Sequence, residues 1–299
     1  MNMKTIHVGD VAIGEGHPLA LIAGPCVIES EDIVLGTAEK VKAIADRLGM
    51  PLIFKSSYLK DNRSSAKSYQ GPGLEKGLRI LQKVKEEFGI PVLSDIHDQH
   101  DAPACAEVLD VIQIPAFLSM QTSLLLAVAK TGKVINVKKG QFLAASDMQT
   151  AINKINGEGN DQILLTERGT FFGYHNLIID MRNLKIMRDL GYPVVLDTTH
   201  AIRKYGVSSS DRRGGAKEFI FGLTRAGVAA GVDALFIETH PDCDGALCDA
   251  ASMLPLQKLE ELLKQAKAID ELIKPHLPYD EVGIYDYKEY EQKVKAVER

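Results

Sequence analysis

Eight short apolar runs mark this chain, and each is followed by a polar or ionisable residue and then by a stretch with helical periodicity. The residues that end the runs are Cys26, Lys55, Asp95, Gln113, Lys138, Arg168, His200 and Glu238. A repeated strand–helix alternation predicts a parallel sheet, and eight units are the number that closes a (β/α)8 TIM barrel. The carboxyl ends of barrel strands face one pocket, so we expect these residues to meet there.

The predicted strands span residues 19–23, 51–54, 91–93, 111–114, 134–137, 163–165, 193–196 and 234–237. The predicted helices span residues 33–48, 73–88, 99–108, 119–130, 146–156, 178–190, 216–230 and 256–273. Pro51, Pro91 and Pro193 each follow a Gly-x doublet, which ends a helix and starts a strand. An open doubly wound sheet shows the same alternation, but eight units without a GxGxxG loop favour closure.

The segments at the two ends lie outside this repeat. Residues 1–18 predict a β-hairpin around Gly9-Asp10 that closes the bottom of the barrel. Residues 279–299 form a charged, tyrosine-containing C-terminal extension of one domain that spans residues 1–299. The long polar loop 203–215 is a candidate lid.

Charge and hydropathy narrow the function classes. The chain has 35 basic and 40 acidic residues and no basic block, which argues against nucleic-acid binding. No run of about 18 apolar residues predicts a membrane span, and the N-terminus lacks the apolar core of a signal peptide. Four cysteines in a chain of this length fit a reducing cytoplasm rather than a disulfide scaffold.

Several basic residues nevertheless fall at or just after strand ends: Lys55, Lys60, Arg63, Lys138 and Arg168. Internal ion pairs with Asp95, Glu167 or Asp197 would explain some of them, because charges seldom end buried strands without partners. A converging set of ammonium and guanidinium groups predicts instead a substrate with a phosphate and a carboxylate. Arg203, at the start of the polar loop, could add a further cation.

Residues 60–65 place an amide and hydroxyl groups beside two cations, which suits a sugar phosphate. We expect Arg63 and Ser64 to contact the phosphate and Asn62 a sugar hydroxyl. Two other interpretations stay open. Lys138 or Lys55 could form the Schiff base of a class I aldolase, or the barrel could bind a sugar phosphate without turnover.

Candidate metal ligands follow the first, seventh and eighth strands and the loop after the eighth: Cys26, His200, Glu238 and Asp249. Those strands are neighbours in a closed barrel. Thiolate, imidazole and carboxylate together suit Zn²⁺, Fe²⁺ or Mn²⁺. His240 and Asp242 compete for the imidazole and carboxylate places, and Cys26 could instead be a small buried apolar side chain.

Four motifs resemble the 3-deoxy-D-manno-octulosonate 8-phosphate synthase (KDO 8-phosphate synthase) family, over about residues 5–275. They are LIAGPC at 21–26, KDNRSS at 60–65, QIPAF at 113–117 and the Asp249 segment before Leu254-Pro255-Leu256. The Asn-Arg-Ser-Ser block separates this family from the related DAHP synthases, which use erythrose 4-phosphate and are the alternative. Asp61 stands where the family usually has alanine.

The resemblance implies a transferase of lipopolysaccharide precursor synthesis that condenses phosphoenolpyruvate with arabinose 5-phosphate and water. It implies that phosphoenolpyruvate contacts Gln113, Ala116, Lys138 and Arg168, and arabinose 5-phosphate contacts Asn62, Arg63, Ser64 and Asp95. The catalytic residues would include Lys55, Lys60, Lys138, His200 and Asp249. A homotetramer is also implied, in which Arg63 and Ser64 are donated to a neighbouring subunit's site.

The family has a metal-dependent branch and a branch in which asparagine replaces the cysteine and no metal is needed. This chain has Cys26, and it reads Asp249-Ala250-Ala251-Ser252 where the metal-free branch tends to have Asp-Gly-Pro. The resemblance therefore implies a divalent ion, such as manganese, zinc or iron, held by Cys26, His200, Glu238 and Asp249.

Overall fold

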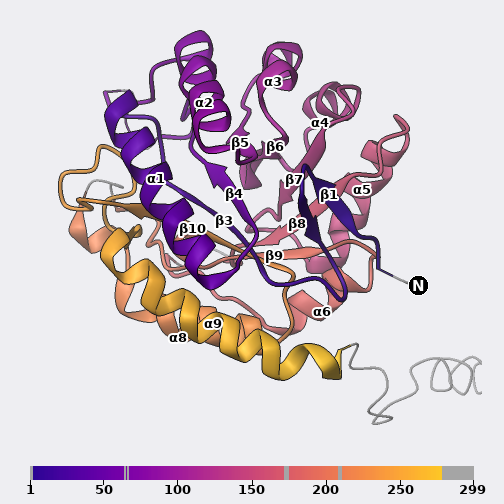
Figure 1. The fold of residues 1–299 in the computed structure, drawn as a ribbon. Helices are drawn as coiled ribbons and strands as arrows, with labels where there is room; N and C mark the ends of the chain where they lie inside the picture. The colour runs from indigo at the N-terminus through magenta and orange to yellow at the C-terminus, as the bar shows by residue number, and fades with distance from the viewer. Residues whose placement is uncertain (1–2, 64, 66, 172–174, 208–210, 278–299) are drawn as a thin grey trace, which may run out of the picture.

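The strands of the chain close into a barrel in the computed structural model, which describes residues 3–63, 65, 67–171, 175–207 and 211–277 (Figure 1). Eight parallel strands pair in chain order from β3 to β10. The last, β10, pairs with both β9 and β3, so the sheet has no open side. The predicted TIM barrel is confirmed, and the open doubly wound sheet is excluded.

The barrel strands are short and every residue in them is buried, as expected for a parallel sheet covered on both faces. They are β3 (Ala20–Gly24), β4 (Leu52–Lys55), β5 (Val92–Asp95), β6 (Val111–Ile114), β7 (Val134–Lys138), β8 (Ile163–Glu167), β9 (Val194–Asp197) and β10 (Ala234–His240). The prediction ended the last strand at residue 237, whereas β10 continues to His240 and contains Glu238. Its extra length pairs with β11 (Leu254–Pro255), a strand that was not predicted.

Helices follow the strands around the outside of the barrel (Figure 1). They are α1 (Glu31–Leu48), α2 (Leu74–Phe88), α3 (Ala102–Val108), α4 (Thr122–Ala129), α5 (Met148–Asn156), α6 (Arg182–Arg188), α7 (Thr198–Ala201), α8 (Ile220–Ala229) and α9 (Leu259–Ile273). In α1, Ser30 caps the first turn by accepting from the Ile33 amide at 3.2 Å, and Gly49 ends the helix with a φ of 61°.

Several predicted helices begin too early. Short 3-10 turns occupy residues 99–101, 145–147, 217–219 and 256–258 before α3, α5, α8 and α9. The helix predicted from residue 178 begins only at Arg182, because Ile178 and Thr170 exchange backbone hydrogen bonds of 2.9 and 3.0 Å in an antiparallel bridge. Apolar periodicity alone cannot separate such a turn or bridge from the helix that follows it.

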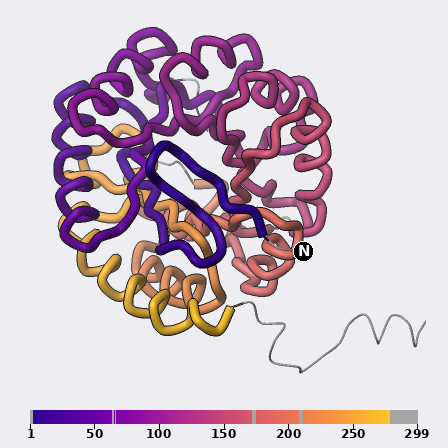
Figure 2. Tube along the Cα trace, turned by 45° about the vertical axis from the view of Figure 1, so that its right-hand side comes forward, coloured from indigo at the N-terminus to yellow at the C-terminus, as the bar shows by residue number. Residues whose placement is uncertain are grey.

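The N-terminal segment forms the predicted hairpin from β1 (Ile6–Val8) and β2 (Val11–Ile13). Its four buried apolar side chains join one cluster with inward-facing residues at the strand starts, among them Ala20, Val111 and Ala234. Figure 2 shows the hairpin crossing the middle of the ring. The hairpin therefore closes the amino end of the barrel and leaves the carboxyl end for the site.

Two parts of the predicted organisation fall wholly or partly on residues that are not described. The extension 279–299 lies outside the described residues, and so do residues 208–210 of the predicted lid. The two ends of that loop are joined by a backbone bridge between Arg203 and Gly215.

None of the described helices combines the length and the apolar composition needed to cross a bilayer.

The close approach of β3 to β4 gives a test of the packing. A Cβ added at Gly24 would lie 2.0 Å from the Lys55 carbonyl oxygen, so the strands must separate to admit it. We predict that Gly24→Ala lowers the free energy of unfolding by about 1–3 kcal/mol, measured by urea denaturation. Gly36→Ala is the matched control, because a Cβ there meets nothing within 4 Å and alanine stabilises a helix by about 0.5–1 kcal/mol. Equal stability of Gly24→Ala and the unaltered chain would contradict this packing.

Candidate active site

A pocket of about 250 Å³ opens where the carboxyl ends of the strands meet. Most of the predicted site residues line it: Lys60, Asn62, Arg63, Asp95, Gln113, Ala116, Lys138, Arg168, His200, Arg203 and Asp249. Cys26 and Glu238 do not line the pocket but contact Cys248 and His200, which do. Lys55 lies behind them, in contact with both Cys26 and Glu238. Ser64 lies outside the described residues. The strand-end pattern therefore brings the predicted residues to one end of the barrel.

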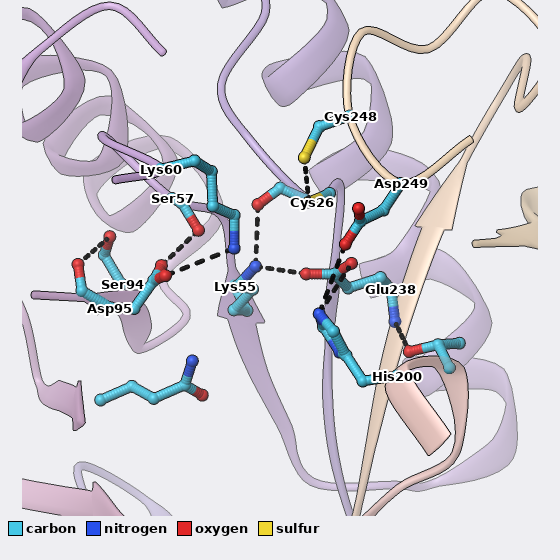
Figure 3. A network of polar contacts seen from close by, with 12 residues as sticks. Cys26, Lys55, Ser57, Lys60, Ser94, Asp95, His200, Glu238, Cys248 and Asp249 are labelled. Atoms are coloured by element: carbon cyan, nitrogen blue, oxygen red, sulfur yellow. Dashed lines mark hydrogen bonds and ion pairs between the residues drawn. The ribbon is translucent and has the colours of Figure 1, made fainter. Parts of the chain in front are cut away.

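Lys55 and Glu238 form a buried ion pair beside the pocket (Figure 3). Lys55 Nζ donates to Glu238 Oε1 at 2.6 Å and to the Cys26 carbonyl oxygen at 2.8 Å. Burial alone would raise the pKa of Glu238, but His200 and then Lys55 outweigh it and lower that pKa. Glu238 is therefore held as a carboxylate, and its other oxygen, Oε2, is buried without a hydrogen-bond partner.

Candidate metal donors gather beside this pair in two groups that share Asp249. In the first group, His200 Nε2 lies 3.6 Å from Glu238 Oε2 and 3.6 Å from Asp249 Oδ2. In the second, Cys26 and Cys248 join Asp249, with the two sulfur atoms 2.9 Å apart. The four predicted ligands thus reach one corner of the barrel as two overlapping sets rather than as one, as Figure 3 shows.

The donor set fits a divalent ion. The unpartnered oxygen of Glu238 faces an imidazole and a second carboxylate, and thiols complete the set. Burial, followed by Cys248, raises the pKa of the Cys26 thiol well above its ordinary value. A thiol in that state becomes a thiolate ligand only when a cation replaces its proton. The alternative ligands, His240 and Asp242, belong to neither group of donors. His240 Nδ1 lies instead 2.6 Å from the Asp242 carbonyl oxygen.

Asp95 organises the side of the pocket next to β4 and β5. It accepts from Lys60 Nζ at 3.3 Å and from the Ser57 hydroxyl, and His97 Nε2 lies at 3.2 Å. Burial alone would lower the pKa of Lys60, but Asp95 together with Cys26 and Glu238 outweighs it, and the net shift is well upward. Lys60 is therefore a charged ammonium group at the pocket wall.

Arg63 reaches the same pocket from the loop after β4. Its Nη1 donates to Cys248 Sγ at 2.6 Å and its Nη2 to the Leu247 carbonyl oxygen at 3.3 Å. The resemblance implied that Arg63 serves a neighbouring subunit. In the structure its guanidinium lies in the pocket of its own chain, where the loop after β10 offers it acceptors, and its donation to a neighbouring subunit stays a prediction.

Gln113 and Lys138 line the next part of the pocket, on β6 and β7. Lys138 Nζ is 2.5 Å from Asp197 Oδ2 and 3.7 Å from the centre of the Phe236 ring. Burial lowers the pKa of Lys138, although Asp197 opposes this. Gln113 Oε1 accepts from Asn136 Nδ2 at 3.1 Å, which fixes the orientation of its amide.

Arg168 differs from the other predicted cations. Arg168 is 4% exposed, and its Nη1 has no hydrogen-bond partner. Among the described residues it forms no ion pair. The neighbouring Glu167 is occupied instead by the backbone amides of Arg168 and Gly169 and lies 3.7 Å from Lys139. Internal ion pairs therefore explain Lys55, Lys60 and Lys138 but not Arg168.

Two pocket residues were missed as site residues. Cys248 was not among the predicted site residues, yet it contacts both Cys26 and Arg63. Tyr205 was not singled out. Its hydroxyl accepts from Gln141 at 2.7 Å, and its ring stacks on Phe171 with centroids 5.1 Å apart. Neither lies on a strand end or in a periodic segment, and only the polarity of their loops pointed to them.

The family model and the related proteins that match this chain cover most of its length. Residues 2–275 match the model of the DAHP synthetase I family. The 2-dehydro-3-deoxyphosphooctonate aldolase of Syntrophotalea carbinolica is 54% identical over 270 residues, which cover 90% of this chain and 97% of that protein. Proteins of the same name from Trichlorobacter lovleyi and Geobacter metallireducens are 53% and 52% identical, each over 91% of this chain and 99% of their own length.

The Asp95 cluster predicts a dependence of stability on pH. Burial raises the pKa of Asp95, but Lys60 and then His97 hold it well below its ordinary value. Such a carboxylate stabilises the fold above its unfolded pKa of about 3.9, and that contribution is lost as the pH falls from there towards the folded pKa. We predict that Asp95→Asn lowers the free energy of unfolding at neutral pH by about 3–5 kcal/mol, because Lys60 loses its buried partner. The deficit should shrink as the pH falls through about 4.

Urea unfolding at a series of pH values measures this difference. Val92→Ala, on the same strand, is the control, because it removes only apolar contacts and should lower stability equally at every pH. A deficit for Asp95→Asn that stays constant across the acid range would show that the charge of Asp95 is not the source of its contribution.

Proposed function

The chain belongs to the DAHP synthetase I family, and from this membership and its relatives we infer the reaction that it catalyses. It condenses phosphoenolpyruvate with arabinose 5-phosphate and water, giving 3-deoxy-D-manno-octulosonate 8-phosphate and phosphate. The relatives' name, 2-dehydro-3-deoxyphosphooctonate aldolase, describes this activity, so the erythrose 4-phosphate alternative is not favoured. The product is a precursor of lipopolysaccharide.

The buried guanidinium of Arg168 is the observation that carries the substrate-binding proposal. A buried cation without an anionic partner among the described residues is costly, so an anionic ligand is expected to complete it. Phosphoenolpyruvate brings a carboxylate and a phosphate, and a planar guanidinium binds either through two parallel hydrogen bonds. Lys138 supplies a second cation, while Gln113 and Ala116 form the adjoining wall.

Arabinose 5-phosphate is assigned to the side of the pocket that holds Asp95 and Arg63. Arg63 offers a cation for the sugar phosphate, and Asn62 lines the same wall. Asp95 can accept from a sugar hydroxyl. The charged ammonium of Lys60 is suited to stabilise the negative charge that develops on the aldehyde oxygen. Ser64 remains a prediction.

The reaction needs two bound anions held so that C3 of phosphoenolpyruvate faces the sugar aldehyde. As the carbon–carbon bond forms, C2 gains positive character and water adds there. The resulting hemiketal phosphate then loses phosphate by breaking its C–O bond. Lys55 and Lys138 each form an ion pair with a buried carboxylate, at 2.6 and 2.5 Å, so neither nitrogen is free to attack a carbonyl carbon as in a Schiff-base aldolase.

A divalent ion held by Cys26, His200, Glu238 and Asp249 is the proposed cofactor. When bound, it would act as a Lewis acid that polarises the aldehyde or a water molecule. The buried, unpartnered oxygen of Glu238 beside His200 supports a cation at this corner.

We also propose a homotetramer in the cytoplasm. The exposed rings of Phe117 and Phe142, 49% and 51% accessible, support a subunit interface.

The reaction predicts that phosphate release from phosphoenolpyruvate depends on the added sugar phosphate. Arabinose 5-phosphate should support rapid release and erythrose 4-phosphate should not, in a continuous phosphate assay. A reversed preference would point to the DAHP reaction. Trapping of the protein by borohydride with substrate would point to a Schiff-base enzyme.

The same assay tests the role of Arg168. Arg168→Met keeps much of the side-chain length but removes the charge, and we expect kcat/KM for phosphoenolpyruvate to fall by about 10²–10³-fold. Arg182→Met is the control, because Arg182 is exposed and paired with Asp180 on the outside of the barrel. Near-normal kinetics of Arg168→Met would remove this residue from the site.

Metal removal tests the proposed cofactor. Treatment with dipicolinate should abolish activity, added Mn²⁺ should restore it, and dipicolinate already saturated with metal should have no effect. Cys26→Ser should also lower the metal content measured by mass spectrometry, whereas Cys105→Ser, on α3, should not. Full activity after verified metal removal would contradict the metal-dependent assignment.

A further inference from the structure

Arg203 was predicted to bind a substrate anion, but the structure gives it a carboxylate of its own. Its Nη1 lies 2.5 Å from Asp249 Oδ1, and its side chain is only 18% exposed. This ion pair accounts for a largely buried guanidinium without a substrate anion. Arg203 therefore differs from Arg168, which has no ion pair among the described residues.

The two oxygens of Asp249 have different surroundings. Oδ1 faces Arg203, with Arg63 Nη1 further away at 3.9 Å. Oδ2 faces His200 Nε2 at 3.6 Å. Asp249 is also the one non-glycine residue with a positive φ, 51°, in the part of the chain that the structure describes. Such a backbone conformation persists only where surrounding contacts hold the residue in place.

The guanidinium of Arg203 is itself held from a second direction. Its central carbon lies 5.9 Å from the centre of the Tyr205 ring. That ring is fixed by its stack on Phe171 and by the hydrogen bond from Gln141. The position of Arg203 therefore does not depend on Asp249 alone, and Arg203 can impose an orientation on the carboxylate.

We propose that Arg203 is a positioning residue that holds Oδ1 of Asp249 and so presents Oδ2 to the metal ion. This inference rests on the metal centre of the proposed function. Partners that orient a ligand from behind commonly contribute about 10–100-fold to metal affinity. An Arg203 that bound substrate would affect the Michaelis constants, whereas an Arg203 that orients Asp249 affects the affinity for the ion.

Titration of the metal-free full-length enzyme with Mn²⁺, followed by the electron paramagnetic resonance signal of the free ion, measures that affinity without turnover. Arg203→Gln should weaken Mn²⁺ binding by about 10–100-fold, and Arg203→Lys should recover part of the loss. At saturating Mn²⁺, the KM for each substrate should stay within about threefold of normal. A raised KM with unchanged Mn²⁺ affinity would return Arg203 to the substrate role and overturn the proposal.

Arg213→Gln is the matched control. Arg213 lies near the end of the same loop and pairs with Asp211 at 2.6 Å, but it is exposed, so Mn²⁺ affinity should not change. A loss as large as that of Arg203→Gln would show a general effect of loop charge and overturn the proposal. Circular dichroism confirms that each variant is folded.

A double-mutant cycle with Asp249→Asn locates the effect. Arg203→Gln should add little to the loss caused by Asp249→Asn, because both act through one ligand. A full, independent loss would overturn the proposal. If the unaltered enzyme binds neither Mn²⁺ nor Zn²⁺, the metal centre itself fails. If it binds Mn²⁺ and Arg203→Gln binds it equally well, only the role of Arg203 fails.

Discussion

The buried ion pair between Lys55 and Glu238 is the interaction around which the rest of the site is arranged. Two charges 2.6 Å apart and almost inaccessible to water must neutralise one another. The pair uses one oxygen of Glu238 and leaves Oε2 facing His200. Asp249 repeats the pattern, with Oδ1 on Arg203 and Oδ2 towards the same imidazole. Two carboxylates thus each use one oxygen for a protein cation and turn the other towards His200.

This division separates the cations that have a carboxylate partner from one that has none among the described residues. Lys55, Lys138 and Arg203 each have a carboxylate partner at 2.6 Å or less, so removal of any of them leaves a buried anion behind. Arg168 has no such partner among the described residues, so its removal affects mainly what binds in the pocket. Sequence position alone does not distinguish these cases, because Lys55, Lys138 and Arg168 all fall at strand ends.

The sequence was sufficient for the barrel, the hairpin and the convergence of the strand-end residues, because those follow from the period of the apolar runs and the closure of a parallel sheet. It was not sufficient where contacts arise between loops. The Cys26–Cys248 contact joins residues 222 positions apart, and no periodicity places a loop cysteine over a strand end. The partner of Arg203 was likewise out of reach, since the conformation of Asp249 depends on its tertiary contacts.

The candidate metal corner lies at the seam where the barrel closes. Strand β10 pairs with β3 on one side and β9 on the other, so Glu238, Cys26 and His200 come together only when the first and last strands meet. The Lys60–Asp95 cluster, by contrast, joins β5 to the loop after β4, two neighbouring units that are close in sequence. The sugar side of the pocket therefore depends on local pairing, whereas the metal corner depends on closure of the whole ring. A cation bound across that seam would favour the closed barrel, because its ligands exist as a set only there.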